Sequence, residues 1–530
     1  MVKPAASPLP ATAGEPPGRS RLVRDAFDAL ALALVGAHAV YWTVMPSLVS
    51  GTFTLDAGEA LFWGREWQLG YYKHPPLMAW VAELGVAAFG RSLATIYLVS
   101  QGCIAAAFAG VWWLARRLVS SAGAFLAVAA LMLFLPFTVQ SVNFNANVAL
   151  LPFWAWAIGL AWTALEKNTV GSWLGLGAVA GLGLLAKYSI LILAAAIALY
   201  CLLTPARRWV LRAPGPWIAL AAALLVASPH LFWLATQSAG PLANVVEARA
   251  AGGMPPTPLF HAALFLAHQV VVALPLLAVV AVWAVASGRG FRAVRAPAPE
   301  SHRHREALRY LLFATLAPVA LTLAAALASG QNAPTRWSFT FPIAAGLLAV
   351  LAWPWLERDL SERRAPRVAI STFAAGALAL AAAWPIHHRG AALLGRAPPK
   401  TAYDGAAEGA IVDAFWERRR AGPLRYQVSH FGGPEGRALA SGTAFFSRHR
   451  PSVFHGADRR LAPWIDLADY RRHGGVVVAE GPIRPGTILA GLCVTEVERF
   501  ERPIRYRGYG PAHFHVGLLA PSPEPKRSCP

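Results

Sequence analysis

The stretch from Leu55 to Leu77 reads LDAGEALFWGREWQLGYYKHPPL, and it sets carboxylates, cations and aromatic rings between two long apolar segments. Only 14% of the 530 residues are charged and 56% are hydrophobic, so such a cluster is unusual in this chain. Its prolines and glycines argue against one continuous helix. If the flanking segments cross a membrane, the cluster lies just outside the bilayer. There an acid–base group can meet water on one side and a lipid on the other, so we take this stretch as the candidate active site.

Apolar runs of about 18–25 residues recur along the first three-quarters of the chain, and this length spans a bilayer as a helix. They predict a polytopic α-helical membrane protein with about eleven transmembrane helices. The strongly basic loops all fall on one side of this arrangement, as expected for cytoplasmic loops. That parity explains the net charge of +20 without nucleic acid as a partner. We expect a multi-pass protein of the bacterial cytoplasmic (inner) membrane.

The predicted domains follow from these runs and from a change of composition near residue 400. Residues 1–25 are expected to be a disordered, basic cytoplasmic N-terminus, and residues 26–390 a transmembrane domain with its first outer loop at 50–92. Residues 400–525 alternate helix-like and strand-like segments, which predicts a soluble α/β domain on the periplasmic side. The apolar stretch 173–203 is too long for one span, and Lys187 is expected to mark the outer junction between two.

The four cysteines are Cys103, Cys201, Cys493 and Cys529, and none has metal-ligand spacing. Two of them lie inside predicted spans. Cys493 and Cys529 could pair in an oxidising compartment, but the spacing does not decide whether they do.

Asp56 and Glu59 are three residues apart, so on a helical turn they share a face. A carboxylate that is partly desolvated at the bilayer edge can have a raised pKa and act as a general base on an acceptor hydroxyl. The alternative is an ordinary solvated pair of loop carboxylates.

Three cations are expected on the outer side: Lys73 directly follows the carboxylate and aromatic cluster, and Lys187 and Arg336 fall at the outer ends of predicted spans. A phosphate leaving group needs such cations, because they neutralise the charge that develops as its bond breaks. Each cation alone could instead extend to the membrane interface. Together they favour a phosphate site, since the outer loops of the membrane domain carry few other cations.

The uncharged and titratable residues around these charges supply candidate substrate contacts. Aromatic faces suit sugar rings, although Trp and Tyr are also common at membrane interfaces. Asparagine amides on the same side offer donors and acceptors, and helix capping is an equally good role for them. The candidate substrate-binding residues are Trp63, Tyr71, Tyr72, His74, Asn145 and Asn147.

The segment Gly70–Trp80, with Asp56 and Glu59 before it, resembles the signature of bacterial GT-C-fold glycosyltransferases that use polyprenyl-phosphate sugars. This group includes protein O-mannosyltransferases, lipid A aminoarabinose transferases and rhizobial galacturonosyltransferases. The segments 144–147, 186–188 and 335–337 also match the pattern expected there.

The resemblance implies an inverting transfer of a sugar from a polyprenyl monophosphate to a hydroxyl of an envelope acceptor, which could be lipopolysaccharide or lipid A, another glycan or a protein. It makes Asp56 the base. Many relatives have Glu directly after this Asp, where the chain has Ala57, and an acidic residue in the second outer loop, where it has asparagines. No metal ligand is therefore assigned, and a divalent cation as cofactor is left open.

Two other classes of protein remain open from the sequence. A transporter or lipid flippase explains the spans but predicts ionisable residues near the bilayer midplane and repeated halves. A non-catalytic envelope assembly protein would work through its C-terminal domain. Turnover of a polyprenyl-linked sugar separates these classes.

Overall fold

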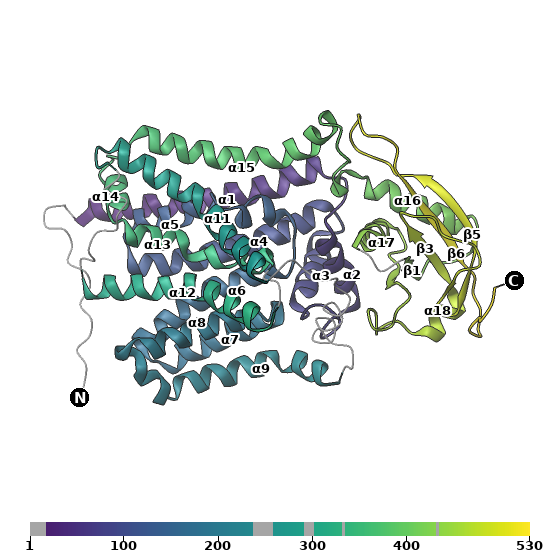
Figure 1. The fold of residues 1–530 in the computed structure, drawn as a ribbon, viewed down its shortest axis with the longest axis horizontal. Coiled ribbons are helices and arrows are strands. Elements are labelled where there is room, and N and C mark those ends of the chain that lie inside the picture. Colours follow the sequence, from purple (N-terminus) through teal and green to yellow (C-terminus); the bar gives the residue numbers. More distant parts are fainter. Residues whose placement is uncertain (1–16, 237–257, 291–300, 331–333, 431–433, 530) are drawn as a thin grey trace.

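The computed structural model describes residues 17–236, 258–290, 301–330, 334–430 and 434–529. A bundle of long helices runs along the longest axis, and a sheet-containing domain closes one end of it (Figure 1). The long helices are α1 (Pro17–Val49), α4 (Leu93–Leu118), α6 (Ala146–Lys167), α9 (Gly215–Thr236), α11 (Pro258–Ala286), α12 (His302–Ala328) and α15 (Arg367–Leu393).

Eight helical segments of the described chain are long and apolar enough to cross a membrane, or up to ten if two bent pairs each count as one span. The polytopic helical architecture is therefore confirmed, and the number eleven is not. Residues 1–16 of the segment expected to be disordered lie outside the described residues. The remainder of that segment, from Pro17, already belongs to α1.

The apolar run at 124–139 predicts one continuous span by its composition, but the structure has a bent pair there. Helix α5 (Ser121–Leu131) ends early, and the short 3-10 helices η1 (Leu135–Phe137) and η2 (Val139–Val142) turn away from it by 87°. Pro136 lies at the bend, and proline cannot continue an α-helical hydrogen-bond ladder. The bend sets the following segment, Asn143–Asn145, beside the start of α2 (Leu55–Glu66), where Asn143 contacts Thr54 and Asp56.

The second bent pair is α8 (Ile190–Leu203) followed by η3 (Pro205–Arg212), bent by 116°. Helix α7 (Val170–Ala186) precedes it, and Lys187 is the residue after its last turn. The predicted interruption of the apolar stretch at Lys187 is therefore present. A further apolar segment is built from η5 (Thr335–Ser338), η6 (Phe341–Ala344) and α13 (Ala345–Ala352), followed by α14 (Trp355–Ser361).

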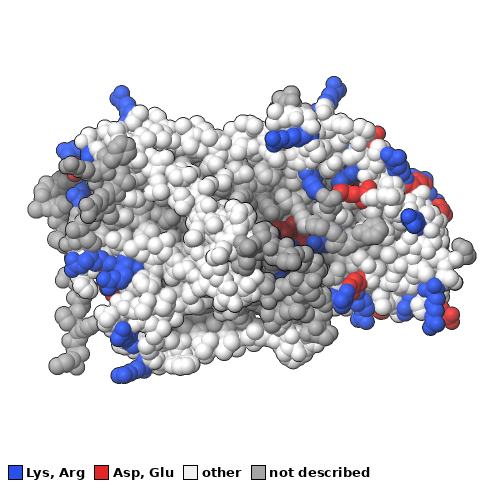
Figure 2. Space-filling model, in the orientation of Figure 1, with Lys and Arg blue, Asp and Glu red and all other residues white. Residues whose placement is uncertain are grey.

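The basic loops gather at the end of the bundle opposite the sheet-containing domain. Ion pairs join helix ends there: Arg116 with Asp28 at 3.2 Å, Arg303 with Glu166 at 3.1 Å and Arg289 with Asp359 at 2.6 Å. In Figure 2, Lys and Arg collect towards the two ends of the visible face, with a mostly uncharged band between them. This band is what a bilayer would surround.

The C-terminal domain has α16 (Gly405–Glu417), α17 (Pro434–Phe446) and α18 (Leu467–His473) around one sheet of order β2-β1-β3-β6-β5-β4. The strands are β1 (Tyr426–Ser429), β2 (Ser452–His455), β3 (Gly475–Ala479), β4 (Ile488–Leu489), β5 (Leu492–Glu501) and β6 (His513–Leu519). Strands β2, β1 and β3 are parallel, and β6 runs antiparallel to β3. The expected α/β domain is confirmed. A disulfide joins Cys493 to Cys529, which settles the pairing that spacing left open.

Two short helices connect the bundle to this domain: α2 (Leu55–Glu66) and α3 (Leu77–Phe89). Helix α2 packs directly on α17, and a Cβ atom at Gly58 would lie 2.8 Å from Cβ of Ser441, so only glycine permits this approach. Arg450 forms a two-pronged ion pair with Glu83 of α3. The C-terminal domain is thus seated on the stretch that carries the candidate site.

Candidate active site

The first turn of α2 carries the candidate base. Thr54 precedes the helix, Asp56 lies in its first turn, and Glu59 follows one turn later on the same side. The unpaired N–H groups of a helix N-terminus favour a carboxylate in this position. Helix α2 ends at Trp67, whose left-handed backbone (φ 46°) turns the chain back towards the carboxylates through residues 68–76.

Asp56 is the accessible carboxylate of the pair, because its side chain is 37% exposed. One of its oxygens lies 3.5 Å from Nζ of Lys73, and the other accepts a hydrogen bond of 3.3 Å from Nδ2 of Asn143. The Thr54 hydroxyl donates to Oδ1 of Asn143, so the Asn143 amide is oriented with its donor towards Asp56. Both contacts of Asp56 are long, which leaves lone pairs free for a hydroxyl group.

Glu59, in contrast, is fully enclosed and paired on both oxygens. Its Oε2 is 2.7 Å from Nζ of Lys73, and its Oε1 is 2.9 Å from Nη1 of Arg437, which comes from α17 of the C-terminal domain. The Tyr72 hydroxyl lies 3.5 Å from Oε1 and accepts a hydrogen bond of 2.5 Å from Arg437. A carboxylate held by two cations is suited to positioning them rather than to removing a proton.

The charges of the three predicted phosphate-binding cations all act on one residue, His74. Burial lowers the pKa of His74 well below its usual value, and the charges of Lys73, Lys187 and Arg336 lower it further. His74 is therefore neutral there. Burial, and next the charge of Arg336, lower the pKa of Lys187 from 10.5 to about 8. Lys187 also donates a hydrogen bond to Oδ1 of Asn147. The charges of residues from three distant segments thus all act on His74.

The aromatic residues divide into two groups. Trp63 and Tyr71 are 0% exposed and stack on one another at 5.0 Å, and the Tyr71 hydroxyl donates to the Trp63 carbonyl oxygen at 2.6 Å. These two rings are enclosed by protein, so in this structure they shape the loop instead of facing a substrate. Tyr72 is tied to the carboxylate cluster, and His74 is half-buried beside the cations.

The asparagines also take different roles. Asn145 is the N-cap of α6, where its Oδ1 accepts from the backbone N–H of Asn147 at 2.8 Å and of Val148 at 3.3 Å. Its Nδ2 donates to the carbonyl oxygen of Asn143. The capping role left open from the sequence is the one that Asn145 has here, and its amide is not free for a substrate. Asn147 remains next to the cations through Lys187.

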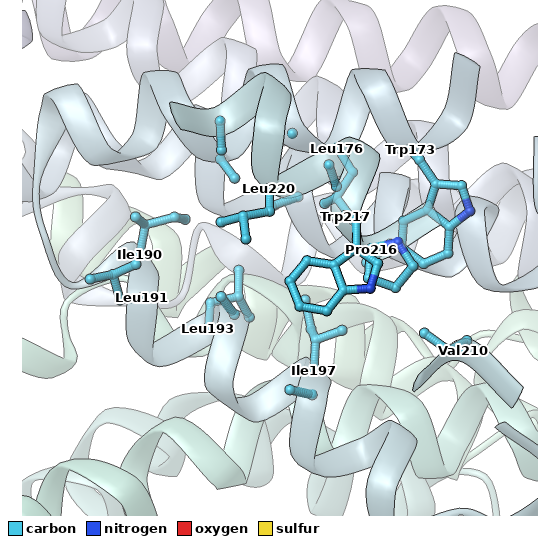
Figure 3. Close-up of a pocket in the computed structure, with 18 of the residues that line it drawn as sticks. Trp173, Leu176, Ile190, Leu191, Leu193, Ile197, Val210, Pro216, Trp217 and Leu220 are labelled. Carbon is cyan, nitrogen blue, oxygen red and sulfur yellow. The ribbon is translucent and has the colours of Figure 1, made fainter. Parts of the chain in front are cut away.

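An apolar groove begins beside Lys187. It has a volume of about 420 Å³ and lies between α6, α7, α8 and α9. Figure 3 shows Ile190 and Leu191 at one end and Trp217 and Val210 towards the other, with aliphatic side chains between them. The lining residues Leu184 and Ile190 each lie three residues from Lys187 in the sequence, so one end of the groove is close to this lysine.

A second, more polar cavity of about 700 Å³ lies between the C-terminal domain and the segment that precedes Asp56. It is at the carboxyl ends of β1 and β3, where ligands bind in many open α/β sheets. Residues Thr52, Phe53 and Leu55 line one side of it, and Arg502 and Glu480 line the other.

Among the residues that the structure describes, no group of three or more His, Cys, Asp or Glu side chains could hold a metal ion.

Sequence reasoning missed Arg437 entirely. It grouped Asn143 with Asn145 and Asn147 as uncharged donors and acceptors on the outer side, but did not identify it as a partner of Asp56. Arg437 is 378 residues from Glu59, its partner, and no local pattern marks it as a site residue. The only available signal was indirect, since a buried carboxylate needs more than one cationic or hydrogen-bonding partner.

The fold is shared with solved structures of another protein. ArnT from Cupriavidus metallidurans in the apo state superposes with a TM-score of 0.56 at 13% identity, over 93% of this chain and 99% of that one. The same protein bound to undecaprenyl phosphate gives 0.55 at 13% identity, over 94% and 99%. The chain therefore has the GT-C fold, and the resemblance seen in the sequence is confirmed.

Sequence comparisons point to the same group. Residues 73–233 match the family model described as dolichyl-phosphate-mannose-protein mannosyltransferase. The chain is 30% identical over 203 residues to the lipid A galacturonosyltransferase RgtD of Rhizobium johnstonii, covering 38% of this chain and 42% of that one. It is 29% identical over 238 residues to the lipopolysaccharide core galacturonosyltransferase RgtB of the same organism, covering 42% and 45%. The matches thus span less than half the length of these relatives.

Proposed function

We propose that the protein is a glycosyltransferase that moves a sugar from a polyprenyl monophosphate donor to a hydroxyl of an envelope acceptor, with inversion at the sugar. The observation that carries the proposal is the contrast within the carboxylate pair. Asp56 is 37% exposed with two long contacts, whereas Glu59 is buried between two cations. One carboxylate is free to accept a proton beside a cluster of cations that suits a phosphate.

The proposed reaction needs little more than these groups. Asp56 takes the proton of the acceptor hydroxyl while the hydroxyl oxygen forms a bond to C1 of the sugar. The bond between C1 and the phosphate oxygen breaks, and its electron pair stays with the phosphate. Lys73, Lys187 and Arg336 bind the phosphate and neutralise the charge that it gains. Such a leaving group needs no general acid.

The apolar groove beside Lys187 fits the prenyl chain of this donor. Its walls are almost entirely aliphatic and aromatic, and its lining residues Leu184 and Ile190 flank Lys187 in the sequence. ArnT, which shares the fold, binds undecaprenyl phosphate, and this supports the same class of lipid here.

The acceptor would occupy the polar cavity at the carboxyl ends of β1 and β3. Leu55 lines this cavity, and Asp56 is the next residue. The cavity also carries charged groups that can hydrogen-bond hydroxyls, including Glu480 and Arg502. Lipid A is the first acceptor to test, because the relatives named above act on lipid A or on the lipopolysaccharide core.

A hexuronic acid is the sugar that best suits the charge of the site. The proposed site has four cations (Lys73, Lys187, Arg336 and Arg437) and two carboxylates, so two positive charges are in excess. A polyprenyl phosphodiester carries one negative charge, and a uronic acid adds a second. The galacturonosyltransferase relatives support the same choice.

The test is a transfer assay on the full chain in lipid nanodiscs, with undecaprenyl-phosphate galacturonic acid as donor and lipid A as acceptor. Mass spectrometry should detect lipid A that has gained one hexuronosyl residue. Undecaprenyl-phosphate mannose serves as a donor control. Two results together would favour the transporter interpretation instead. No polyprenyl-phosphate sugar would be consumed with any envelope acceptor, and the polyprenyl-phosphate lipid would move between the leaflets of vesicles that contain the protein.

We further propose that the basic end of the bundle is cytoplasmic and the C-terminal domain periplasmic, in the bacterial inner membrane. Basic loops at one end and a disulfide in the opposite domain support this orientation. In a background without Cys103 and Cys201, an impermeant maleimide should label Ala421→Cys but not Ser301→Cys in intact spheroplasts. Labelling of Ser301→Cys from outside would reverse the orientation.

The depressed pKa of Lys187 gives a pH dependence. Because this pKa is about 8, the side chain is charged below that pH and loses its charge as the pH rises through it. The value of kcat/KM for the donor should therefore fall above about pH 8, since this ratio reports groups of the free enzyme. Lys187→Arg keeps a charge at every pH tested, so its profile should be flatter even if its rate is lower. An unchanged decline in Lys187→Arg would assign the titration to another group.

A further inference from the structure

We propose that Arg437 of the C-terminal domain is a positioning residue of the active site, which holds Glu59 so that Lys73 remains available to Asp56 and to the donor phosphate. This inference rests on the proposed function. It makes the C-terminal domain a functional part of the site in addition to a cover for it.

The distances show how one lysine is shared. Nζ of Lys73 is 2.7 Å from Glu59 and 3.5 Å from Asp56, so Glu59 is its closer partner. Glu59 is 0% exposed, and a buried carboxylate pairs strongly with any cation within reach. With only Lys73 as partner, Glu59 would draw the ammonium group towards itself. Arg437 binds the other oxygen at 2.9 Å and thereby satisfies the carboxylate from the opposite side.

The geometry of Arg437 points to this role rather than to general adhesion between the domains. Its Nη1 serves both Glu59 and the Tyr72 hydroxyl, at 2.9 and 2.5 Å. Its Nε is buried and has no hydrogen-bond partner in the described part of the chain. Leaving a guanidinium donor buried and unpaired costs stability. The Arg437 side chain therefore adopts the position that gives the contacts with Glu59 and Tyr72, although its Nε–H group is left without a hydrogen-bond partner there.

The neighbouring groups do not compete for Glu59. His455, on β2, is fully buried, and its ring packs edge-on against Phe62 of α2 at 4.6 Å. Burial lowers the pKa of His455 to about 3, and the charges of Arg437 and Lys73 contribute to this shift, so the ring is neutral. Tyr72 keeps its proton, because burial raises its pKa. Among these neighbours, the cations on Glu59 are Lys73 and Arg437.

A matched control lies at the same interface. Arg450 forms a cross-domain ion pair with the buried Glu83, but it contacts neither Asp56, Glu59 nor Lys73 in the described structure. Arg437→Met and Arg450→Met therefore remove charges of the same kind between the same two parts of the protein. Only the first removes a charge from the carboxylate cluster.

The experiment compares kcat and KM for undecaprenyl-phosphate galacturonic acid in both variants and in Arg437→Lys. Arg437→Met should lower kcat/KM by about 10–100-fold, the range found when a residue that orients a metal ligand is lost, which we take as the guide for a residue that orients Glu59 and Lys73. A large part of the loss should appear in KM, because Lys73 is withdrawn from the phosphate. Arg437→Lys should recover most of the activity, and Arg450→Met should stay close to wild type. Equal losses in Arg437→Met and Arg450→Met would overturn the inference in favour of domain docking.

A double-mutant cycle separates positioning from structural damage. If Arg437 acts through the charge of Glu59, then Arg437→Met should add little to the effect of Glu59→Gln, because the charge to be held is already gone. Additive losses would overturn the proposal. Failure of the proposed function is distinguishable from failure of this inference, because in the first case the wild-type protein itself transfers no sugar. If the wild type transfers sugar and Arg437→Met transfers it at the same rate, only the role proposed for Arg437 is wrong.

Discussion

Asp56→Asn should abolish nearly all sugar transfer while the fold and donor binding stay close to those of the wild type. The substitution keeps the shape of the side chain and its contact with Asn143, but the amide cannot accept a proton from the acceptor hydroxyl. Loss of a general base typically lowers a rate by about 10²–10⁴-fold. We would measure kcat in nanodiscs, and donor affinity separately by binding of undecaprenyl phosphate.

Glu59→Gln is the matched variant for this prediction. Glu59 is enclosed between Lys73 and Arg437, so the neutral amide of the glutamine variant should disturb the positions of these cations. The base, Asp56, is retained. We expect a milder loss, and one that affects KM more than the loss in Asp56→Asn does. If Asp56→Asn transfers sugar normally and Glu59→Gln is inactive, Glu59 is the base and Asp56 is not. Normal transfer by both would place the base elsewhere.

Features of the fold that depend on local pattern could be predicted from the sequence. The apolar runs indicated the helical bundle, and the amphipathic pattern of residues 77–89 agrees with the separate short helix α3. The break at Lys187 follows from a run too long for one span. The bend after α5 was missed because its sequence is as apolar as a continuous span, and a single proline decides between the two. Hydropathy measures whether a segment prefers lipid, and it does not report a change of direction.

The candidate site also has features that the sequence could predict and features that it could not. Asp56, Glu59 and Lys73 lie within 18 residues, and Lys73 contacts both carboxylates in the structure. The spacing indicated that the two carboxylates share a helical face, but it gave no sign that Lys73 pairs with them. Burial of Trp63 and Tyr71 could not be predicted, since rings in an outer loop look the same whether they face a sugar or pack inside. Arg437 could not be found either, because its place depends on how a separate domain docks on α2.

The docking of that domain also bears on the alternative interpretations. Glu66 of α2 accepts a hydrogen bond of 2.8 Å from Ser452, and Phe53 packs against Phe445 and Phe446 of α17. A domain fixed this firmly to the candidate site is unexpected for an assembly protein that works through its C-terminal domain alone. It also restricts the movement that a flippase needs at this end of the bundle. A glycosyltransferase, in contrast, requires a rigid site that excludes water from the reacting sugar.

Lys73→Ala should produce the second large effect, a loss of about 10²–10³-fold in kcat/KM for the donor. Lys73 is the cation that touches both carboxylates, and its charge also acts on His74 and Lys187. Its removal takes a positive charge from the phosphate as the bond to the sugar breaks. It also leaves Glu59 with Arg437 as its remaining cationic partner.

Lys187→Ala and Arg336→Ala should each lower the same ratio, and Arg336 should matter less because its side chain is exposed and screened by water. Lys167→Ala is the control for loss of one positive charge, since Lys167 is exposed at the far end of α6. Donor binding and single-turnover rates should be measured for each variant, so that affinity and chemistry are separated. Wild-type kcat/KM in a protein with Lys73, Lys187 and Arg336 all replaced would refute the phosphate site. A loss that appears in Lys73→Ala alone would restrict the phosphate contact to this one lysine.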